Sequence, residues 1–116
     1  MKYGRRDVSY TGSLPSIIEK LIAAVNAHDT KGFVDAFAPG AVIDDWGHQV
    51  VGHDEIRAWN EYEFTGPDVQ IDVTRAERAG QTIVLTVLTS RGTSRSSSHV
   101  AFDIDDGAVT RMTIRA

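Results

Sequence analysis

The spacing of apolar residues changes from helical to extended along this chain, and that change limits the folds open to it. Between residues 14 and 25, apolar side chains recur at intervals of three and four residues, which predicts an amphipathic helix with one buried stripe. From residue 69 onward the pattern is typical of strands, and Asp105-Asp106-Gly107 is a strong hairpin signal. Helices that precede hairpin-connected strands indicate an α+β domain, in which the helices cover one side of a curved antiparallel sheet.

The middle of the chain predicts two more helices with a short hairpin between them. Asp29 is a suitable cap for the second helix, and Pro39-Gly40 is expected to end it. Gly52 opens the third helix, because the acids that follow it suit the positive end of the helix dipole. The predicted elements are a helix over 29–38, strands over 41–46 and 49–51, and a helix from 52 to a stop at 65–67. We expect three helices against four to five strands.

Composition indicates one ordinary globular domain. The chain has 116 residues, a formal charge of −4 and no cysteine, so disulfides are excluded and no basic surface favours nucleic acid. No apolar run approaches the roughly 20 residues of a membrane span. His48 and His53 match no standard metal-site spacing, so we expect neither a metal nor another cofactor. We expect residues 1–12 to form a tail or arm, residues 13–116 to form the domain, and the protein to be cytoplasmic.

Residues 37–59 carry a pattern that resembles a known family. The pattern is Phe-Ala-x-x-Ala-Val at 37–42, an acid at Asp44, Val-x-Gly-x-x-x-Ile at 50–56 and an aromatic residue at Trp59. It is similar to the SnoaL-like polyketide cyclases and ketosteroid isomerases of the nuclear transport factor 2-like superfamily. The resemblance implies a cone in which the curved sheet and the first helix enclose the reactive groups. It does not choose a function, because the superfamily contains isomerases, dehydratases, cyclases and non-catalytic binding modules.

Asp44 is the acid on which the functional prediction depends. By resemblance it falls at the position of the ketosteroid isomerase general base. Alternation of side chains places it on one strand face with Val42 and Trp46, and leaves Asp45 on the other face in solvent. A carboxylate held away from water resists ionisation, so we expect a raised pKa and a role as catalytic acid or base. The alternative is a polar residue at the rim of the sheet without a catalytic role.

His99 is the candidate catalytic partner of Asp44. Counted back from Gly107, it stands where the resemblance puts the oxyanion-hole acid of the isomerases, but a correction for hairpin length moves that position to Val100. Alternation favours the corrected count, because it places His99 on the polar, outward face of its strand. The apolar face of this strand consists of Ser98, Val100, Phe102 and Ile104.

Aromatic and apolar side chains in this chain suit a pocket for a flat ligand, and they equally suit plain core packing. Arg91 and Arg95, beside a turn, suit either an anionic ligand at the mouth of the cone or a solvated rim of the sheet. The predicted ligand-binding residues are Trp46, Trp59, Tyr62, Val100, Phe102, Met112 and Ile114.

These residues predict a cofactor-independent isomerase, cyclase or dehydratase in which Asp44 moves a proton on an apolar, carbonyl-bearing ligand. The alternative is a non-catalytic module that binds a small ligand or a protein on the same fold. Residues 83–88 are apolar on both faces of their strand, and Val84 and Leu88 are offered to the outer side of the sheet. We therefore expect a homodimer formed through that outer face.

Overall fold

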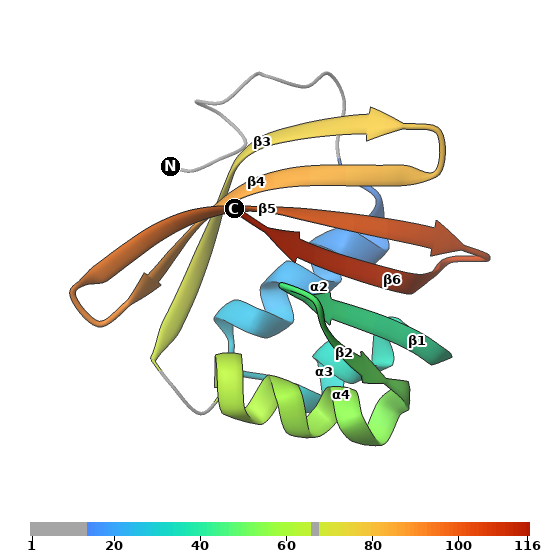
Figure 1. The fold of residues 1–116 in the computed structure, drawn as a ribbon, viewed down its shortest axis with the longest axis horizontal. Helices are drawn as coiled ribbons and strands as arrows, with labels where there is room; N and C mark the ends of the chain where they lie inside the picture. The colour runs from blue at the N-terminus through green and yellow to red at the C-terminus, as the bar shows by residue number, and fades with distance from the viewer. Residues whose placement is uncertain (1–13, 66–67) are drawn as a thin grey trace.

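The computed structural model describes residues 14–65 and 68–116, and the tail predicted for residues 1–12 lies outside this range. All helices in the described chain precede residue 66, and four of the six strands follow it (Figure 1). The α-helices are α2 (Ser16–Asn26), α3 (Thr30–Asp35) and α4 (Gly52–Asn60), and α4 continues into a π-helical turn, η1 (Glu61–Thr65). The strands are β1 (Phe37–Asp45), β2 (His48–Val51), β3 (Val69–Ala79), β4 (Thr82–Arg91), β5 (Ser94–Asp105) and β6 (Ala108–Arg115).

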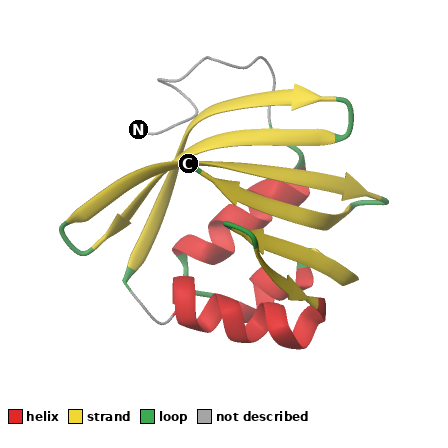
Figure 2. Cartoon of the chain, viewed as in Figure 1, coloured by secondary structure: helices red, strands yellow, loops and turns green. Residues whose placement is uncertain are grey.

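The six strands form one curved sheet in the order β2-β1-β6-β5-β4-β3. Strands β3 to β6 are consecutive antiparallel neighbours, as predicted, whereas β1 pairs with β6 in parallel. The sheet is therefore mixed and six-stranded, which corrects the expected antiparallel sheet of four to five strands. The parallel pair forms because the antiparallel run returns β6 beside a strand from the first half of the chain, and local sequence patterns carry no signal for such a pairing. Figure 2 shows the helices gathered within the curve of the sheet.

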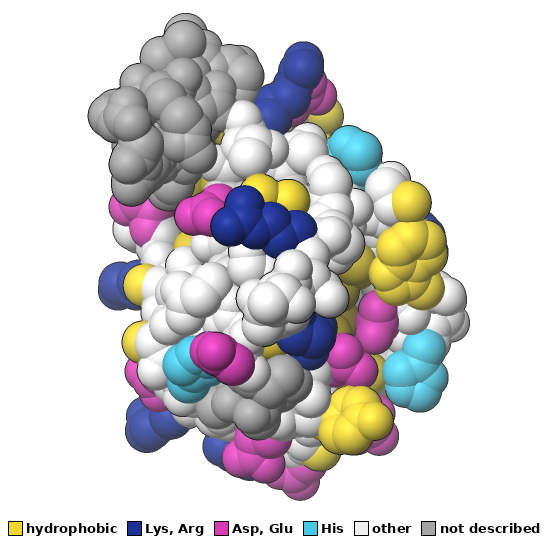
Figure 3. All heavy atoms as spheres, turned by 90° about the vertical axis from the view of Figure 1, so that its left-hand side faces the viewer, with side chains coloured by type: hydrophobic (Ala, Val, Ile, Leu, Met, Phe, Trp, Pro, Cys, Tyr) yellow, Lys and Arg dark blue, Asp and Glu magenta, His cyan; other side chains and the backbone are white. Residues whose placement is uncertain are grey.

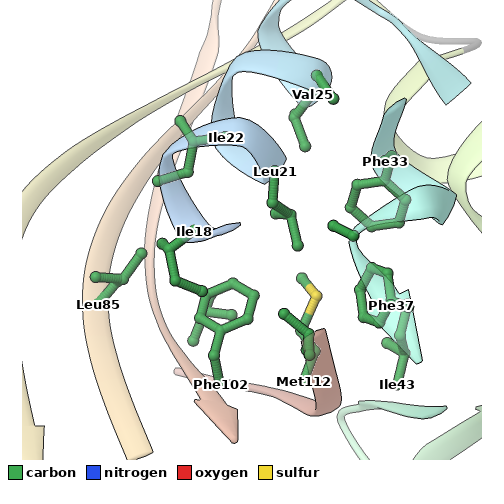
Figure 4. Packing of buried hydrophobic residues seen from close by; sticks show 14 of the residues in the cluster. Ile18, Leu21, Ile22, Val25, Phe33, Phe37, Ile43, Leu85, Phe102 and Met112 are labelled. Atoms are coloured by element: carbon green, nitrogen blue, oxygen red, sulfur yellow. The ribbon is translucent and has the colours of Figure 1, made fainter. Parts of the chain in front are cut away.

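Helix α2 packs its apolar stripe against the inner face of the sheet. Ile18 and Leu21 are almost completely buried, and Figure 4 shows them opposite Leu85, Phe102 and Met112 from the strands. Full burial of one such side chain contributes about 1.5–3 kcal/mol relative to leaving it in water. The stripe that predicted the helix is thus the surface that holds it on the sheet.

Helix α3 is shorter than predicted. Asp29 caps it as expected, since Asp29 Oδ1 accepts a hydrogen bond from the Gly32 backbone N–H at 3.0 Å. The helix stops before Phe37, where β1 begins, so its predicted extension to residue 38 is wrong. Pro39 lies instead within β1, where the pairing with β6 shifts register between Phe37 and Val42. A proline is tolerated there because the interrupted pairing does not need its missing N–H.

One face of the molecule carries side chains of mixed chemical character. On the face shown in Figure 3, acidic, basic, histidine and hydrophobic side chains are interspersed. Residues 14–65 and 68–116 contain no helix long and apolar enough to cross a bilayer. The same residues contain no group of three or more metal-ligating side chains that could hold an ion.

Candidate functional site

The inner face of the sheet, α2 and the end of α4 enclose a cavity of about 220 Å³. Most of its wall is apolar and includes the side chains of Leu85, Val100 and Phe102. Acidic, basic and hydroxyl side chains also reach the wall, and these are Asp45, Glu63, Thr89, Arg91, Ser96, Ser97 and Ser98. The cavity thus combines an apolar interior with a small set of polar groups, which is the usual composition of a small-molecule site.

Asp45 is the aspartate that reaches this cavity. It is half-buried at the end of β1, and its Oδ2 accepts a hydrogen bond from the indole Nε1–H of Trp59 at 3.1 Å. Trp59, on α4, lines the same cavity, so the helix orients the carboxylate from across the site. The expectation that Asp45 points away from the pocket is therefore wrong.

Asp44 lies on the other side of β1, outside the cavity wall. Its Oδ1 accepts hydrogen bonds from the Gly47 backbone N–H at 2.8 Å and from Arg115 Nη1 at 3.1 Å. Its Oδ2 accepts from Arg111 Nη2 and Arg115 Nη2, both at 3.2 Å. These contacts, with the Arg115 hydrogen bond first and the Gly47 N–H next, hold the pKa of Asp44 below its usual value. The predicted raised pKa is wrong, and Asp44 has the surroundings of a structural ion pair.

The turn after β1 explains why the prediction placed Asp44 in the pocket and Asp45 outside it, which is the reverse of the structure. Inward residues alternate along the strand, so Ile43 is completely buried in the core and Asp45 follows on the same face. The prediction set the face of Asp44 by that of Trp46, but Trp46 is no longer in the strand. It has a positive φ of 54°, and Gly47 follows with a φ of 93°. The left-handed turn breaks the alternation, so Trp46 reaches the cavity although Asp44 does not.

His99 lies on the outer face of the sheet. Its Nδ1 is 2.8 Å from the backbone oxygen of Ala116, and it shares a shallow outer depression with Val84 and Thr86. The neighbouring residue Val100 lines the cavity. The alternation argument is confirmed, and a catalytic pair made of Asp44 and His99 inside the cavity is wrong.

Six of the seven predicted ligand-binding residues line the cavity. Tyr62 is the exception, because it lies in the π-helical turn η1 with 79% of its side chain exposed. The predicted ligand-binding set left out the hydroxyl and charged part of the wall on β4 and β5, although the sequence had suggested Arg91 for an anionic ligand and placed Ser98 on the inward face. Extending the alternation that placed Val100 inward would have added Ser96. The six that line the cavity are Trp46, Trp59, Val100, Phe102, Met112 and Ile114.

Comparison with known proteins identifies the family. The SnoaL-like domain matches residues 18–112, which is most of the chain. The chain belongs to the SnoaL-like domain family. The predicted nuclear transport factor 2-like fold is confirmed, because NTF2-like proteins are among the structural matches of this SnoaL-like chain. A search of curated proteins finds no match.

Solved structures of similar fold include proteins named for the predicted chemistry. A "putative polyketide cyclase" from Sinorhizobium meliloti superposes with a TM-score of 0.82 at 24% identity, covering 88% of this chain and 95% of that one. A "putative ketosteroid isomerase" from Kribbella flavida gives a TM-score of 0.76 at 22% identity, covering 86% and 74%. RV0760c from Mycobacterium tuberculosis, in complex with estradiol-17beta-hemisuccinate, gives 0.76 at 14% identity, covering 85% and 89%. At these identities the likeness shows the fold.

Proposed function

We propose that this SnoaL-like protein is a cofactor-independent enzyme of the isomerase, cyclase or dehydratase type, with Asp45 as the residue that moves the proton. The observation that carries the proposal is the Asp45 carboxylate on the wall of a largely apolar cavity, held by the Trp59 indole at 3.1 Å. The sequence pointed to Asp44 as this acid, but Asp44 is bonded to Arg111 and Arg115 and does not line the cavity. Asp45 supplies the same chemistry from the adjacent position.

The proposed step is proton transfer at a carbon next to a carbonyl group. An ionised carboxylate has several lone-pair sites, so one hydrogen bond from an indole leaves Asp45 able to accept a proton. The C–H bond breaks, its electron pair passes into the carbonyl to form an enolate, and the proton moves to Asp45. Returning the proton to the far carbon of a conjugated enolate isomerises the ligand. Attack of the enolate carbon on a second carbonyl closes a ring, and the alkoxide formed takes the proton from Asp45. In a dehydration the β-hydroxyl takes that proton and leaves as water. Ser98, half-buried on the cavity wall, carries a hydroxyl donor suited to the enolate oxygen.

The size of the cavity limits the ligand. Its volume of about 220 Å³ lies below the roughly 300–1,000 Å³ typical of sites for drug-sized ligands. A ligand whose buried part has two fused rings suits this volume better than a complete four-ring steroid. The steroid in the RV0760c complex and a designed 17-OHP binder of the same fold support a flat, apolar ligand class.

Exchange of acidic C–H protons in D₂O tests the proposal. The probe is 2-tetralone, a bicyclic ketone with activated C–H bonds beside its carbonyl, and exchange is followed by NMR. We expect the wild-type protein to accelerate exchange above the rate in buffer and Asp45→Asn to abolish the acceleration, because an amide does not accept the proton. Asp72→Asn, which removes an exposed acid outside the cavity, is the matched control and should exchange like wild type. Binding of 2-tetralone without accelerated exchange would favour the non-catalytic binding module.

We also propose that the protein forms a homodimer through the outer face of the sheet. Val84 and Leu88 are half-buried and do not line the cavity, so they present apolar surface on the outer side, as predicted. Val84 also lines the outer depression that contains His99. Pairing this face with a second copy would cover apolar surface that a single chain leaves in water.

A further inference from the structure

The cavity wall formed by β4 and β5 changes from apolar to polar along its length. Leu85 pairs with Val100, the next inward pair is Val87 with Ser98, and the pair after that is Thr89 with Ser96. All six side chains line the cavity. The wall therefore runs from two aliphatic residues, through a mixed pair, to two hydroxyl residues.

Arg91 stands at the outer end of this wall. It lines the cavity and its Nη1 donates a hydrogen bond to the backbone oxygen of Glu63 at 3.1 Å. Glu63 contributes its neutral backbone carbonyl to this bond, and its carboxylate, which also lines the cavity, forms no salt bridge with Arg91. Within residues 14–65 and 68–116, Arg91 forms no salt bridge. A guanidinium has five N–H donors, so most of the donors of Arg91 are available to a ligand.

Asp45 and Arg91 stand in different rows of the sheet, and the third charged side chain of the wall, Glu63, belongs to the residue whose backbone oxygen bonds Arg91. Asp45 pairs with Ile114, Ile114 with Val100, and Val100 with Leu85, so Asp45 and Leu85 belong to one row across the sheet. Arg91 is six residues further along β4, at the end of the strand away from this row. A ligand that spans this wall can therefore carry a negative charge at its outer end without placing it against the Asp45 carboxylate.

We propose that Arg91, with the hydroxyls of Thr89 and Ser96, binds a carboxylate at the outer end of the ligand. This inference rests on the proposed function, which places the reacting carbonyl group at Asp45, and it narrows the substrate class to flat apolar ketones that carry an acid at the far end. Carboxylates bind guanidinium groups through charge-assisted, often bidentate hydrogen bonds, and hydroxyl donors complete such a site. The apolar stretch between the two ends accommodates the ring system of the ligand.

A matched pair of ligands tests the proposal. The pair is 2-tetralone and its 6-carboxylate, which differ only in an acid at the end of the ring system opposite the ketone. We expect wild-type protein to bind the carboxylate roughly tenfold more tightly by isothermal titration calorimetry, as one charge-assisted contact at an accessible site predicts. Arg91→Met should remove this preference. Added salt should weaken the preference in the wild-type protein, because the contact is open to screening by counterions.

Arg95→Met is the matched control. Arg95 is on β5 near the same turn and does not line the cavity, so its loss changes the net charge equally and should leave the preference intact. Circular dichroism melting of both variants reports whether they fold. If Arg91→Met and Arg95→Met reduce the preference equally, the effect is general electrostatics and the inference is overturned.

Binding measurements on the wild-type protein distinguish failure of the carboxylate site from failure of the proposed function. If wild type binds 2-tetralone but binds its carboxylate no more tightly, the carboxylate site is wrong and the proposed function stands. If wild type binds neither compound, the proposed function is contradicted for this ligand class, and the carboxylate inference is overturned with it.

Discussion

The hydrogen bond between Trp59 and Asp45 should stabilise the fold measurably as well as orient the acid. In the native protein the Trp59 ring stacks on Phe33 with centroids 6.1 Å apart. Trp59→Phe removes the indole N–H and retains an aromatic ring at this position. Asp45→Ala removes the acceptor. Either substitution also changes packing, so neither single variant measures the hydrogen bond by itself. A double-mutant cycle isolates it, because packing losses that are independent of the pair cancel.

The expected coupling free energy is about 1 kcal/mol. Hydrogen bonds to charged groups contribute roughly 1.5–3 kcal/mol, and the half-buried Asp45 carboxylate remains partly accessible to water, which lowers the value. For a domain of this length, about 1 kcal/mol corresponds to a shift of roughly 3–5 °C in melting temperature. Urea denaturation of wild type, both single variants and the double variant at pH 7 gives the four free energies of unfolding that the cycle needs.

A second cycle serves as control. Trp46 lines the same cavity, but its side chain forms no hydrogen bond with the described residues and is 60% exposed. Pairing Trp46→Phe with Asp45→Ala gives the coupling that packing between neighbours produces without a hydrogen bond, because residues that share a cavity are not independent. If the Trp59 cycle gives no more than this, the carboxylate is not held by the indole, and the orientation on which the proposed function depends is refuted.

Two further predictions concern the outer face of the sheet. The pKa of Asp44 is lowered in the folded state, so the stability that its ionised carboxylate contributes is complete above its ordinary pKa of 3.8 and is lost as pH falls below that value. Asp44→Asn should therefore melt at a lower temperature than wild type at pH 7, and thermal melts should show this difference shrinking toward pH 2. Equal melting temperatures at pH 7 would contradict the structural role of Asp44. Light scattering after gel filtration at micromolar concentration should give twice the chain mass of 12.7 kDa, and a mass near 12.7 kDa would rule out the homodimer.

The types of the elements could be predicted from the sequence because each has a clear period or turn signal. The stripe of α2 and the Asp106-Gly107 turn both appear in the structure where the pattern placed them. The parallel pairing of β1 with β6 could not be predicted in this way, since it joins segments about seventy residues apart, such as Ile43 with Met112. The same limit applies to any contact that depends on how the sheet closes on itself.

The face of a strand is predictable only where one side is clearly apolar. On β5, Val100 and Phe102 alternate with polar neighbours, so the inward set was unambiguous and His99 was correctly placed outside. On β1, Val42 and Ile43 are adjacent apolar residues, one half-buried and the other completely buried. Apolar residues on both faces of a strand do not show which face is buried. Choosing the wrong face here assigns the pocket to Asp44 where the structure has Asp45.

The two adjacent acids lie on opposite sides of the sheet, and Asp44 holds the turn that follows them. A left-handed backbone conformation costs a residue with a side chain roughly 1–2 kcal/mol, and Trp46 adopts it at φ 54°. Asp44 offsets this cost from outside, because its Oδ1 accepts the Gly47 N–H of the same turn while the β6 arginines hold its carboxylate. The same turn keeps Trp46 on the cavity wall beside Asp45. Loss of Asp44 should therefore change the cavity through the shape of the turn, whereas loss of Asp45 removes the proposed proton acceptor and leaves the turn in place.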